Sequence, residues 1–225
     1  MLIVGFPAAA FGTNCYILAT TEGERCLVVD PGIDVVGQLE EVLAEHRLHP
    51  AAVLLTHGHL DHTFSVTPVC GAHDVPAYIH GEDAHRLVDP LPSLGPQVLA
   101  AFGGTLDWTE PQDVRPLHDG SVLELAGLTL TVVHAPGHTE GSVLFELPSG
   151  VDMAPVCLSG DVLFAGSIGR TDLPGGDPGA MLTSLRTKIL PLRDETIVLP
   201  GHGPQTTIAH ERATNPYLRE LISRR

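Results

Sequence analysis

The sequence predicts an α/β protein in which two β-sheets pack face to face and helices cover their outer faces. Short apolar runs bounded by Gly, Pro and Asp come first in hairpin order, then alternate with helical patterns, and then recur before a last helix. The chain has 225 residues, of which 43% are hydrophobic and 17% charged. This is enough for a sizeable core, so we expect residues 1–225 to form one domain.

The first elements are three expected strands, at residues 2–6, 15–19 and 26–29, each of which is a strand-length apolar run. A helix over residues 35–48 follows them, because apolar residues recur there with helical spacing. Asp34 directly precedes this helix and is expected to cap it.

The next stretch is expected to alternate strands and short helices. A buried strand at residues 51–55 is followed by a helix at 63–69, which Pro68 should shorten. A strand at 75–79 and a weak helix at 82–88 complete this part.

Residues 89–116 differ from their surroundings because Pro and Gly interrupt any regular spacing of apolar residues there. A long surface connection is one interpretation. Long loops inside compact domains are often functional, so a lid over a site is the other, with Phe102 and Trp108 as its notable side chains.

The C-terminal half returns to strands and ends in helices. Asp177 followed by Pro178 predicts a helix start, and Asn215 followed by Pro216 predicts another. The expected strands cover residues 122–125, 128–133, 143–147, 156–158 and 197–199, and the expected helices cover 178–190 and 216–225.

The charge balance excludes several partners. Lys and Arg number 12 against 27 Asp and Glu, so the formal net charge is −15. Such a chain repels phosphate backbones and anionic membranes, which argues against nucleic-acid and membrane partners. No apolar run approaches the ~20 residues of a membrane span, and no signal peptide is recognisable, so we expect a cytoplasmic protein. The cysteines form no C-x-x-C pair and are expected to be reduced thiols: Cys15, Cys26, Cys70 and Cys157.

Metal-competent side chains follow the ends of four predicted strands. The segment Thr56-His57-Gly58-His59-Leu60-Asp61-His62 directly follows the strand at 51–55. Later strands lead through a glycine to His138, Asp161 and His202 in the same way. Strand ends usually present ligands, and recurrence of the pattern implies that these ends converge on one site.

The ligand count fits two metal ions. His57, His59 and His138 provide one site. Asp61, His62 and His202 provide a second, and the two oxygens of Asp161 can bridge them. Each ion keeps open positions for water, as catalytic sites do, whereas closed structural zinc sites usually include cysteine. Imidazole and carboxylate ligands suit zinc, which is the first candidate, and also iron or manganese.

Other residues show weaker signals. Asp30 also ends a strand and either accepts a hydrogen bond from a ligand imidazole or opens the turn that follows it. The remaining histidines show no ligand spacing, and His134 is expected to be a packing residue or an outer neighbour of the site: His46, His49, His73, His80, His85, His118, His134 and His210.

This pattern resembles the metallo-β-lactamase superfamily, whose H-x-H-x-D-H motif is matched at residues 57–62 and whose later His, Asp and His are matched at His138, Asp161 and His202. The resemblance implies an αββα sandwich with a dinuclear site at one edge. Residues 160–170 resemble the glyoxalase II (hydroxyacylglutathione hydrolase) branch, in particular its short bacterial type. There a basic residue nine positions after the bridging Asp contacts glutathione, which implies that Arg170 binds substrate.

The expected reaction is hydrolysis of a small-molecule thioester, such as an S-2-hydroxyacylglutathione, by a metal-bound hydroxide. Asp61 would orient this hydroxide. A thiol has a pKa of about 8.5, so the thiolate leaves without a dedicated general acid. Two alternatives stay open. Residues 169–172 also resemble the persulfide dioxygenase branch, which uses one iron ion, and a non-catalytic metal-binding module is the other.

Overall fold

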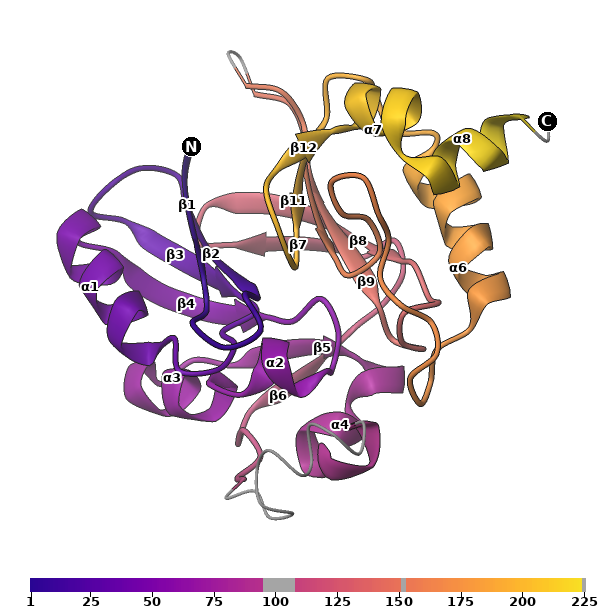
Figure 1. The fold of residues 1–225 in the computed structure, drawn as a ribbon. Coiled ribbons are helices and arrows are strands. Elements are labelled where there is room, and N and C mark those ends of the chain that lie inside the picture. Colours follow the sequence, from indigo (N-terminus) through magenta and orange to yellow (C-terminus); the bar gives the residue numbers. More distant parts are fainter. Residues whose placement is uncertain (95–107, 151–152, 224–225) are drawn as a thin grey trace.

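The computed structural model describes residues 1–94, 108–150 and 153–223. Two six-stranded sheets lie face to face at its centre, and helices cover the outer face of each sheet (Figure 1). The predicted α/β sandwich is therefore confirmed. No helix in the described part of the chain is long and apolar enough to cross a membrane.

The first sheet is built by the N-terminal half in sequence order, β1-β2-β3-β4-β5-β6. Its first three strands pair antiparallel and the later ones parallel. The strands are β1 (Leu2–Pro7), β2 (Asn14–Ala19), β3 (Arg25–Val29), β4 (His49–Leu54), β5 (Ala77–His80) and β6 (Val114–Leu117). The helices of this half are α1 (Val36–His46), α2 (Leu60–Thr63), α3 (Val66–His73) and α4 (His85–Val88), with 3-10 turns at Gly81–Asp83 and Leu91–Ser93.

The second sheet has the order β12-β11-β10-β9-β8-β7. Only β10 and β11 pair parallel in it, and the other neighbours are antiparallel. Its strands are β7 (Val122–Leu125), β8 (Leu128–His134), β9 (Val143–Leu147), β10 (Val156–Gly160), β11 (Ile197–Pro200) and β12 (Thr206–Thr207). Its outer face is covered by α6 (Pro178–Ser184), the π-helical turn η3 (Leu185–Ile189), α7 (Ile208–Thr214) and α8 (Pro216–Ser223).

The core follows from the alternation of side chains along the strands. In β4, Val53 packs against α1 and α3, whereas Ala52 and Leu54 face the second sheet. A third layer lies between the second sheet and its helices, where Leu144 and Cys157 meet the buried side of α6 and η3. Because both faces of the central strands are buried, their runs are almost entirely apolar.

Several hydrogen bonds join the two sheets at the edge where β4, β10 and β11 end. The Val143 amide donates to the carbonyl of Thr56 at 2.8 Å. The Asn14 amide donates to the carbonyl of Gly201 at 2.7 Å, and the Asn14 side chain donates to that of Pro200 at 2.9 Å. The loops that follow these strands are thereby brought together.

The predicted connection at 89–116 needs a correction. Residues 95–107, which include Phe102, lie outside the described residues. Part of the remainder forms β6, which sequence analysis missed because this edge strand is mostly exposed and contains Pro116. Trp108 packs against the outer core of the first sheet, and its indole donates to the carbonyl of Leu87 at 2.7 Å.

Some helix boundaries also differ from the expectation. Asp34 does not cap α1, since that helix has Val35 at its N-cap and Asp34 adopts φ +58°. Pro68 does not shorten a helix, because it is the third residue of α3 and its missing N–H falls in the first turn. Asp177 does cap α6, by accepting from the amides of Gly179 and Ala180. The short elements α7 and β12 were not predicted.

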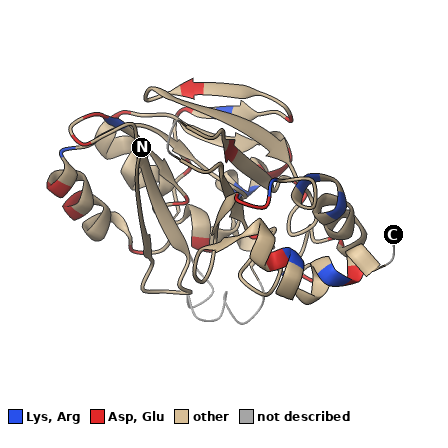
Figure 2. Ribbon diagram, turned by 90° about the horizontal axis from the view of Figure 1, so that it is seen from above, with Lys and Arg blue, Asp and Glu red and all other residues tan. Residues whose placement is uncertain are grey.

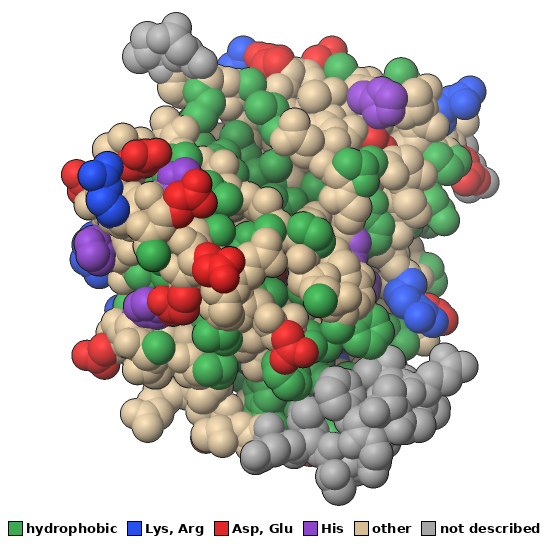
Figure 3. All heavy atoms as spheres, turned by 60° about the vertical axis from the view of Figure 1, so that its left-hand side comes forward, with side chains coloured by type: hydrophobic (Ala, Val, Ile, Leu, Met, Phe, Trp, Pro, Cys, Tyr) green, Lys and Arg blue, Asp and Glu red, His purple; other side chains and the backbone are tan. Residues whose placement is uncertain are grey.

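Lys, Arg, Asp and Glu residues occur on helices, strands and loops (Figure 2). The basic residues are fewer than the acidic ones. On the face shown in Figure 3, the basic side chains are scattered among acidic ones and form no continuous basic patch. The absence of a nucleic-acid partner rests on the net charge of the chain and stays a prediction.

Candidate metal centre

The H-x-H-x-D-H segment turns sharply after β4 and enters α2. A Cβ on Gly58 would lie 2.7 Å from Cδ of Arg86 and 2.9 Å from its Cβ, so only glycine fits there. The turn directs His57 and His59 inward, and the first turn of α2 then carries Asp61 and His62. The position of the motif after a strand, expected from the sequence, is thus observed.

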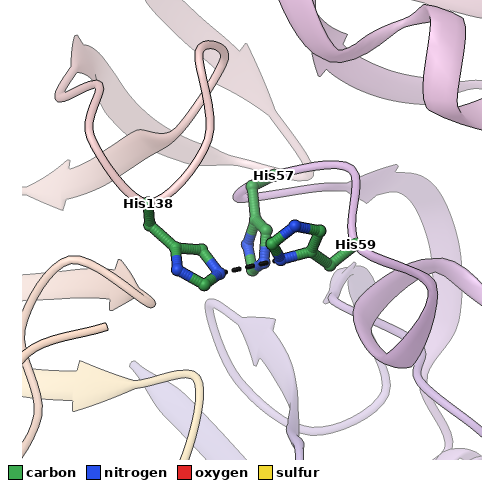
Figure 4. Close-up of side chains that lie close together, drawn as sticks. All are labelled: His57, His59 and His138. Carbon is green, nitrogen blue, oxygen red and sulfur yellow. Dashed lines mark hydrogen bonds between the residues drawn. The ribbon is translucent and has the colours of Figure 1, made fainter. Parts of the chain in front are cut away.

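His57, His59 and His138 form one group of converging imidazoles, called here the three-histidine group (Figure 4). Nδ1 of His59 lies 2.8 Å from Nε2 of His138. The ring centroid of His57 is 4.9 Å from that of His59 and 4.7 Å from that of His138. All of these side chains are buried.

Asp61, His62 and His202 form a second group. Nε2 of His62 lies 3.3 Å from Nε2 of His202 and 3.6 Å from Oδ2 of Asp61. Nε2 of His202 is 3.2 Å from the same Asp61 oxygen. Asp61 and His202 are partly exposed, so this group is more open to solvent than the three-histidine group.

Asp161 lies between the two groups. Its Oδ1 is 3.4 Å from Nε2 of His62, and its Oδ2 is 3.5 Å from Nε2 of both His138 and His202. The structure therefore brings together all the residues that the sequence singled out as metal ligands, with the carboxylate at the position expected for a bridge.

The outer nitrogens of four imidazoles are held by acceptors. Nδ1 of His57 is 3.1 Å from Oγ1 of Thr56. Nδ1 of His62 is 3.0 Å from Oδ2 of Asp30. The other contacts are to the carbonyls of Arg170, 2.7 Å from His138, and of Phe11, 3.2 Å from His202. A proton on each Nδ1 leaves the Nε2 lone pair directed into the site, as metal ligands require.

Asp30 is one of these outer partners, so of its two interpretations the structure favours the hydrogen bond to a ligand imidazole. Its Oδ1 accepts from the amide of Thr56 at 2.8 Å and its Oδ2 from the hydroxyl of the same residue at 2.6 Å. Asp30 is buried and therefore has no solvent to replace these partners.

The donor set fits a divalent metal centre. Nε2 of His57, Nε2 of His59 and Oδ1 of Asp161 are buried atoms without a hydrogen-bond partner among the described residues. Buried polar atoms are otherwise almost always satisfied, so several unpaired atoms in one cluster of His and Asp side chains indicate a site for a ligand. Imidazole and carboxylate donors suit zinc, iron or manganese. The thiols lie elsewhere, as buried free cysteines.

The electrostatics of the two groups differ. Burial lowers the pKa of His57 well below its ordinary value and that of His59 to about 3, so the three-histidine group is neutral. Burial also acts on His62, but the charges of Asp161 and Asp61 outweigh it and raise the pKa of His62. The carboxylates thus favour a positive charge at the second group, which a proton or a metal ion can supply.

Another cluster of metal-competent side chains consists of His80, Glu82 and His134. Its two imidazoles are stacked, with centroids 4.1 Å apart and planes at 13°. Stacked rings cannot both direct an in-plane lone pair at one ion, and Nε2 of His134 already lies 2.8 Å from the carbonyl of Glu140. His134 thus packs against His80, which is one of the two roles expected for it from the sequence.

A cavity of about 750 Å³ opens beside both groups. Its polar lining includes His59, Asp61, His138, Asp161 and His202. Its apolar lining includes Phe11, Ile33, Leu60, Phe164, Ile168 and Leu173. Such a combination of apolar walls and a few convergent polar groups is typical of small-molecule sites.

Arg170 lines the same cavity, as its place after Asp161 suggested. Its Nε lies 2.7 Å from Oδ1 of Asp172, and its second guanidinium contact, also 2.7 Å, is to Oδ2. The Arg170 side chain is 61% exposed, so this ion pair is solvated and weak enough to exchange for a substrate carboxylate.

Several residues that contact the site carry no signal in the sequence. Thr13 donates its hydroxyl to Oδ2 of Asp61 at 2.9 Å. Asp83 and Arg86 are buried beside the three-histidine group and hydrogen-bond its loops. None of them stands in a metal-binding motif, and only the tertiary contacts reveal their role.

The comparisons with known proteins agree with this geometry. The family model of the metallo-beta-lactamase superfamily matches residues 8–202. An uncharacterized protein of Mycobacterium leprae is 47% identical over 98% of this chain and 100% of its own length. The hydroxyacylglutathione hydrolase GloC of Haemophilus influenzae is 35% identical over 94% of this chain and 95% of its own length.

Two solved structures share the fold closely. The BLEG-1 B3 metallo-beta-lactamase has a TM-score of 0.85 and 38% identity and covers 96% of this chain and 99% of its own. TTHA1623 in a di-iron-bound form has a TM-score of 0.78 and 39% identity and covers 96% and 100%. With its family match, its fold and its converging His and Asp side chains, the chain belongs to the metallo-β-lactamase superfamily.

Proposed function

We propose that this protein is a dinuclear metallo-hydrolase that cleaves thioesters, with S-2-hydroxyacylglutathiones or related thiol esters as substrates. The observation that carries the proposal is the position of Asp161, whose two oxygens face two separate groups of candidate ligands beside one cavity. The relationship to a hydroxyacylglutathione hydrolase over nearly the whole chain supports the choice of substrate class.

Zinc is the metal we propose, with iron or manganese also compatible with the ligands. Bound ions would lower the pKa of a coordinated water toward about 7 and polarise the substrate carbonyl. The donors on the chain are neutral imidazoles in one group and carboxylate-paired imidazoles in the other. The di-iron form of a protein that is 39% identical supports two ions in this arrangement.

Asp61 is the proposed catalytic carboxylate. Its Oδ2 accepts from the hydroxyl of Thr13 at 2.9 Å and faces His202 at 3.2 Å, and it lies on the cavity wall. Burial would raise its pKa, but the charges of His62 and His202 outweigh burial and hold that pKa low. An ionised Asp61 can orient the attacking water by accepting a hydrogen bond from it.

The leaving group explains why no further acid is needed. A thiolate leaves readily because the pKa of a thiol is about 8.5. Asp172, a further carboxylate on the cavity wall, is hydrogen-bonded by Arg170, which lowers its pKa to about 2. It is therefore poorly suited to donate a proton at neutral pH, which favours thioesters over esters with alkoxide leaving groups.

Substrate binding is proposed to divide between the apolar walls and Arg170. Phe164 and Phe11 lie next to His202, the former with its ring 5.9 Å away and the latter through its carbonyl. They offer apolar contact to the acyl part. The guanidinium of Arg170 offers a bidentate partner for a carboxylate on the thiol carrier.

The test is a paired assay of the purified protein loaded with zinc, iron or manganese. Release of free thiol from a 2-hydroxyacylglutathione without oxygen uptake supports the proposal. Stoichiometric oxygen uptake with a persulfide, and no thioester cleavage, would instead establish the mononuclear iron dioxygenase. If two ions are bound but neither these reactions nor β-lactam hydrolysis occurs, the result favours a non-catalytic metal-binding module.

A second candidate is β-lactam hydrolysis, because the BLEG-1 B3 metallo-beta-lactamase is 38% identical over 96% of this chain. The same attack on a carbonyl would open the lactam ring, but the leaving amine then needs a proton. A chromogenic cephalosporin in the same assay series distinguishes the two. Turnover of the cephalosporin at a kcat/KM above that of the thioester would favour the lactamase.

A further inference from the structure

We infer that Asp83 and Arg86 are positioning residues that hold the two loops of the three-histidine group together and thereby set its affinity for a metal ion. This inference rests on the metal-binding part of the proposed function and not on the substrate. Neither residue is itself a candidate metal ligand. Both act through the two metal-site loops, which are residues 55–59 with His57 and His59, and residues 135–142 with His138.

Asp83 is completely buried and connects the two loops directly. Its Oδ2 accepts from the amide of Gly58 at 2.7 Å and from the hydroxyl of Thr139 at 2.7 Å. Its Oδ1 accepts from the amide of Gly141 at 3.0 Å. Gly58 stands between His57 and His59, and Thr139 follows His138, so one carboxylate fixes the backbone next to all three imidazoles.

Arg86 is 2% exposed and compensates the charge of that carboxylate. Its Nε donates to Oδ1 of Asp83 at 3.2 Å. One terminal nitrogen donates to the hydroxyl of Ser93, and the other donates to Glu140 at 2.5 Å and to the carbonyl of Pro174 at 3.3 Å. The network therefore extends from the metal-site loops to the cavity wall.

The packing around this network leaves it little freedom. A Cβ on Gly141 would lie 2.7 Å from Cβ of Asp83, and a Cβ on Gly58 would lie 2.7 Å from Arg86. Both loops thus approach the ion pair as closely as glycine allows. Since Nδ1 of His59 and Nε2 of His138 come from different loops and lie only 2.8 Å apart, a small shift of one loop changes the shape of the three-histidine group.

Two variants remove single contacts. Asp83→Asn keeps the shape, but its NH₂ must replace one of the two acceptor oxygens. It therefore loses either the hydrogen bonds from Gly58 and Thr139 or those from Gly141 and Arg86. Thr139→Val removes only the hydroxyl, and Thr139→Ser restores it. Groups that orient metal ligands typically change metal affinity about 10–100-fold when altered. We expect Asp83→Asn and Thr139→Val to weaken ion binding at the three-histidine group by this factor and Thr139→Ser to stay close to wild type.

The measurement is a competitive titration of the full chain with cobalt or zinc against a chromophoric chelator, which gives two dissociation constants. His59→Ala and His202→Ala identify which constant belongs to which group. Glu211→Gln is the matched control, because this buried carboxylate accepts from Gly166, Thr206 and Asn215 and touches neither metal-site loop. Thermal melting of each variant records its loss of stability.

A selective loss at the three-histidine group in Asp83→Asn and Thr139→Val, with rescue by Thr139→Ser and none of this loss in Glu211→Gln, supports the inference. It is overturned if both variants keep the wild-type constants, or if they weaken both ions equally and Glu211→Gln does the same. If Asp83→Asn fails to fold, the comparison of Thr139→Val with Thr139→Ser tests the inference by itself. Failure of the wild-type chain to bind two ions would instead refute the proposed function.

Discussion

Asp30 offers a sharp test of how the chain prepares an imidazole for a metal ion. It is buried and accepts three hydrogen bonds, from the amide and hydroxyl of Thr56 at 2.8 and 2.6 Å and from Nδ1 of His62 at 3.0 Å. The last contact keeps the proton of a neutral His62 on Nδ1. The Nε2 lone pair then faces Asp161 and His202.

The perturbation is Asp30→Asn, which preserves shape but replaces one acceptor by an NH₂ group. If the NH₂ faces the Thr56 amide, two donors meet in a buried place, at a cost of about 1–3 kcal/mol. If it faces His62, that imidazole must accept on Nδ1 and carry its proton on Nε2, where it blocks an ion. We therefore expect the ion at the Asp61, His62 and His202 group to bind about 10–100-fold more weakly, which corresponds to roughly 1.4–2.8 kcal/mol.

The assay is the same two-site metal titration, combined with thermal melting. Loss should be larger at the second group, since Asp30 contacts His62 directly and reaches His57 only through the hydroxyl of Thr56. Glu211→Gln again reports the effect of disturbing a buried carboxylate away from the ligands. Wild-type affinity for both ions in Asp30→Asn, with only a lower melting temperature, would refute the reasoning and leave Asp30 a purely structural residue.

Asp161→Ala should lose at least one of about two ions and nearly all activity, as elemental analysis beside a thiol-release assay will show, whereas unchanged stoichiometry would contradict a bridge. Arg170→Met should raise KM about tenfold for an acidic thioester and leave its kcat unchanged, and the kinetics of an uncharged thioester should not change. The effect on KM is modest because Asp172 already competes for the guanidinium. Equal losses for both substrates would exclude carrier binding. Burial raises the pKa of Cys26 and Cys70 to about 12, and it also raises the pKa values of Cys15 and Cys157. A disulfide reagent at pH 8 should therefore react with the thiols only after denaturation. Rapid reaction in the folded protein would show that the core opens.

The sequence predicted the features that depend on local pattern. Strands such as β3 and β10 are buried on both faces, so their composition alone identifies them. The ligand histidines were found because a glycine and a His or Asp recur after such strands. Asp177 was found as a cap because Pro178 follows it, and the structure confirms both.

The features that escaped prediction depend on tertiary contacts. The burial of Arg86 could not be predicted, because two of the partners that enclose its guanidinium, Glu140 and Pro174, lie far away in the sequence. The strand β6 is mostly exposed and contains proline, so its pairing with β5 decides its conformation. Likewise α7 has only seven residues, too few for an apolar period to stand out.

The site lies on the seam between the two sheets, and this position ties metal binding to folding. The first sheet and its loops provide His57, His59, Asp61 and His62, whereas the second provides His138, Asp161 and His202. Neither half offers a complete set of ligands, so ions bind the assembled sandwich much better than the unfolded chain. An ion at 100 times its dissociation constant then stabilises the fold by about 2.7 kcal/mol, or roughly 5–10 °C in Tm for a chain of this size. A strong chelator should lower Tm by that amount for each ion, and His59→Ala should abolish one of the two increments. A Tm that does not respond to the chelator would contradict this coupling, because it would mean that no bound ion joins ligands from the two sheets.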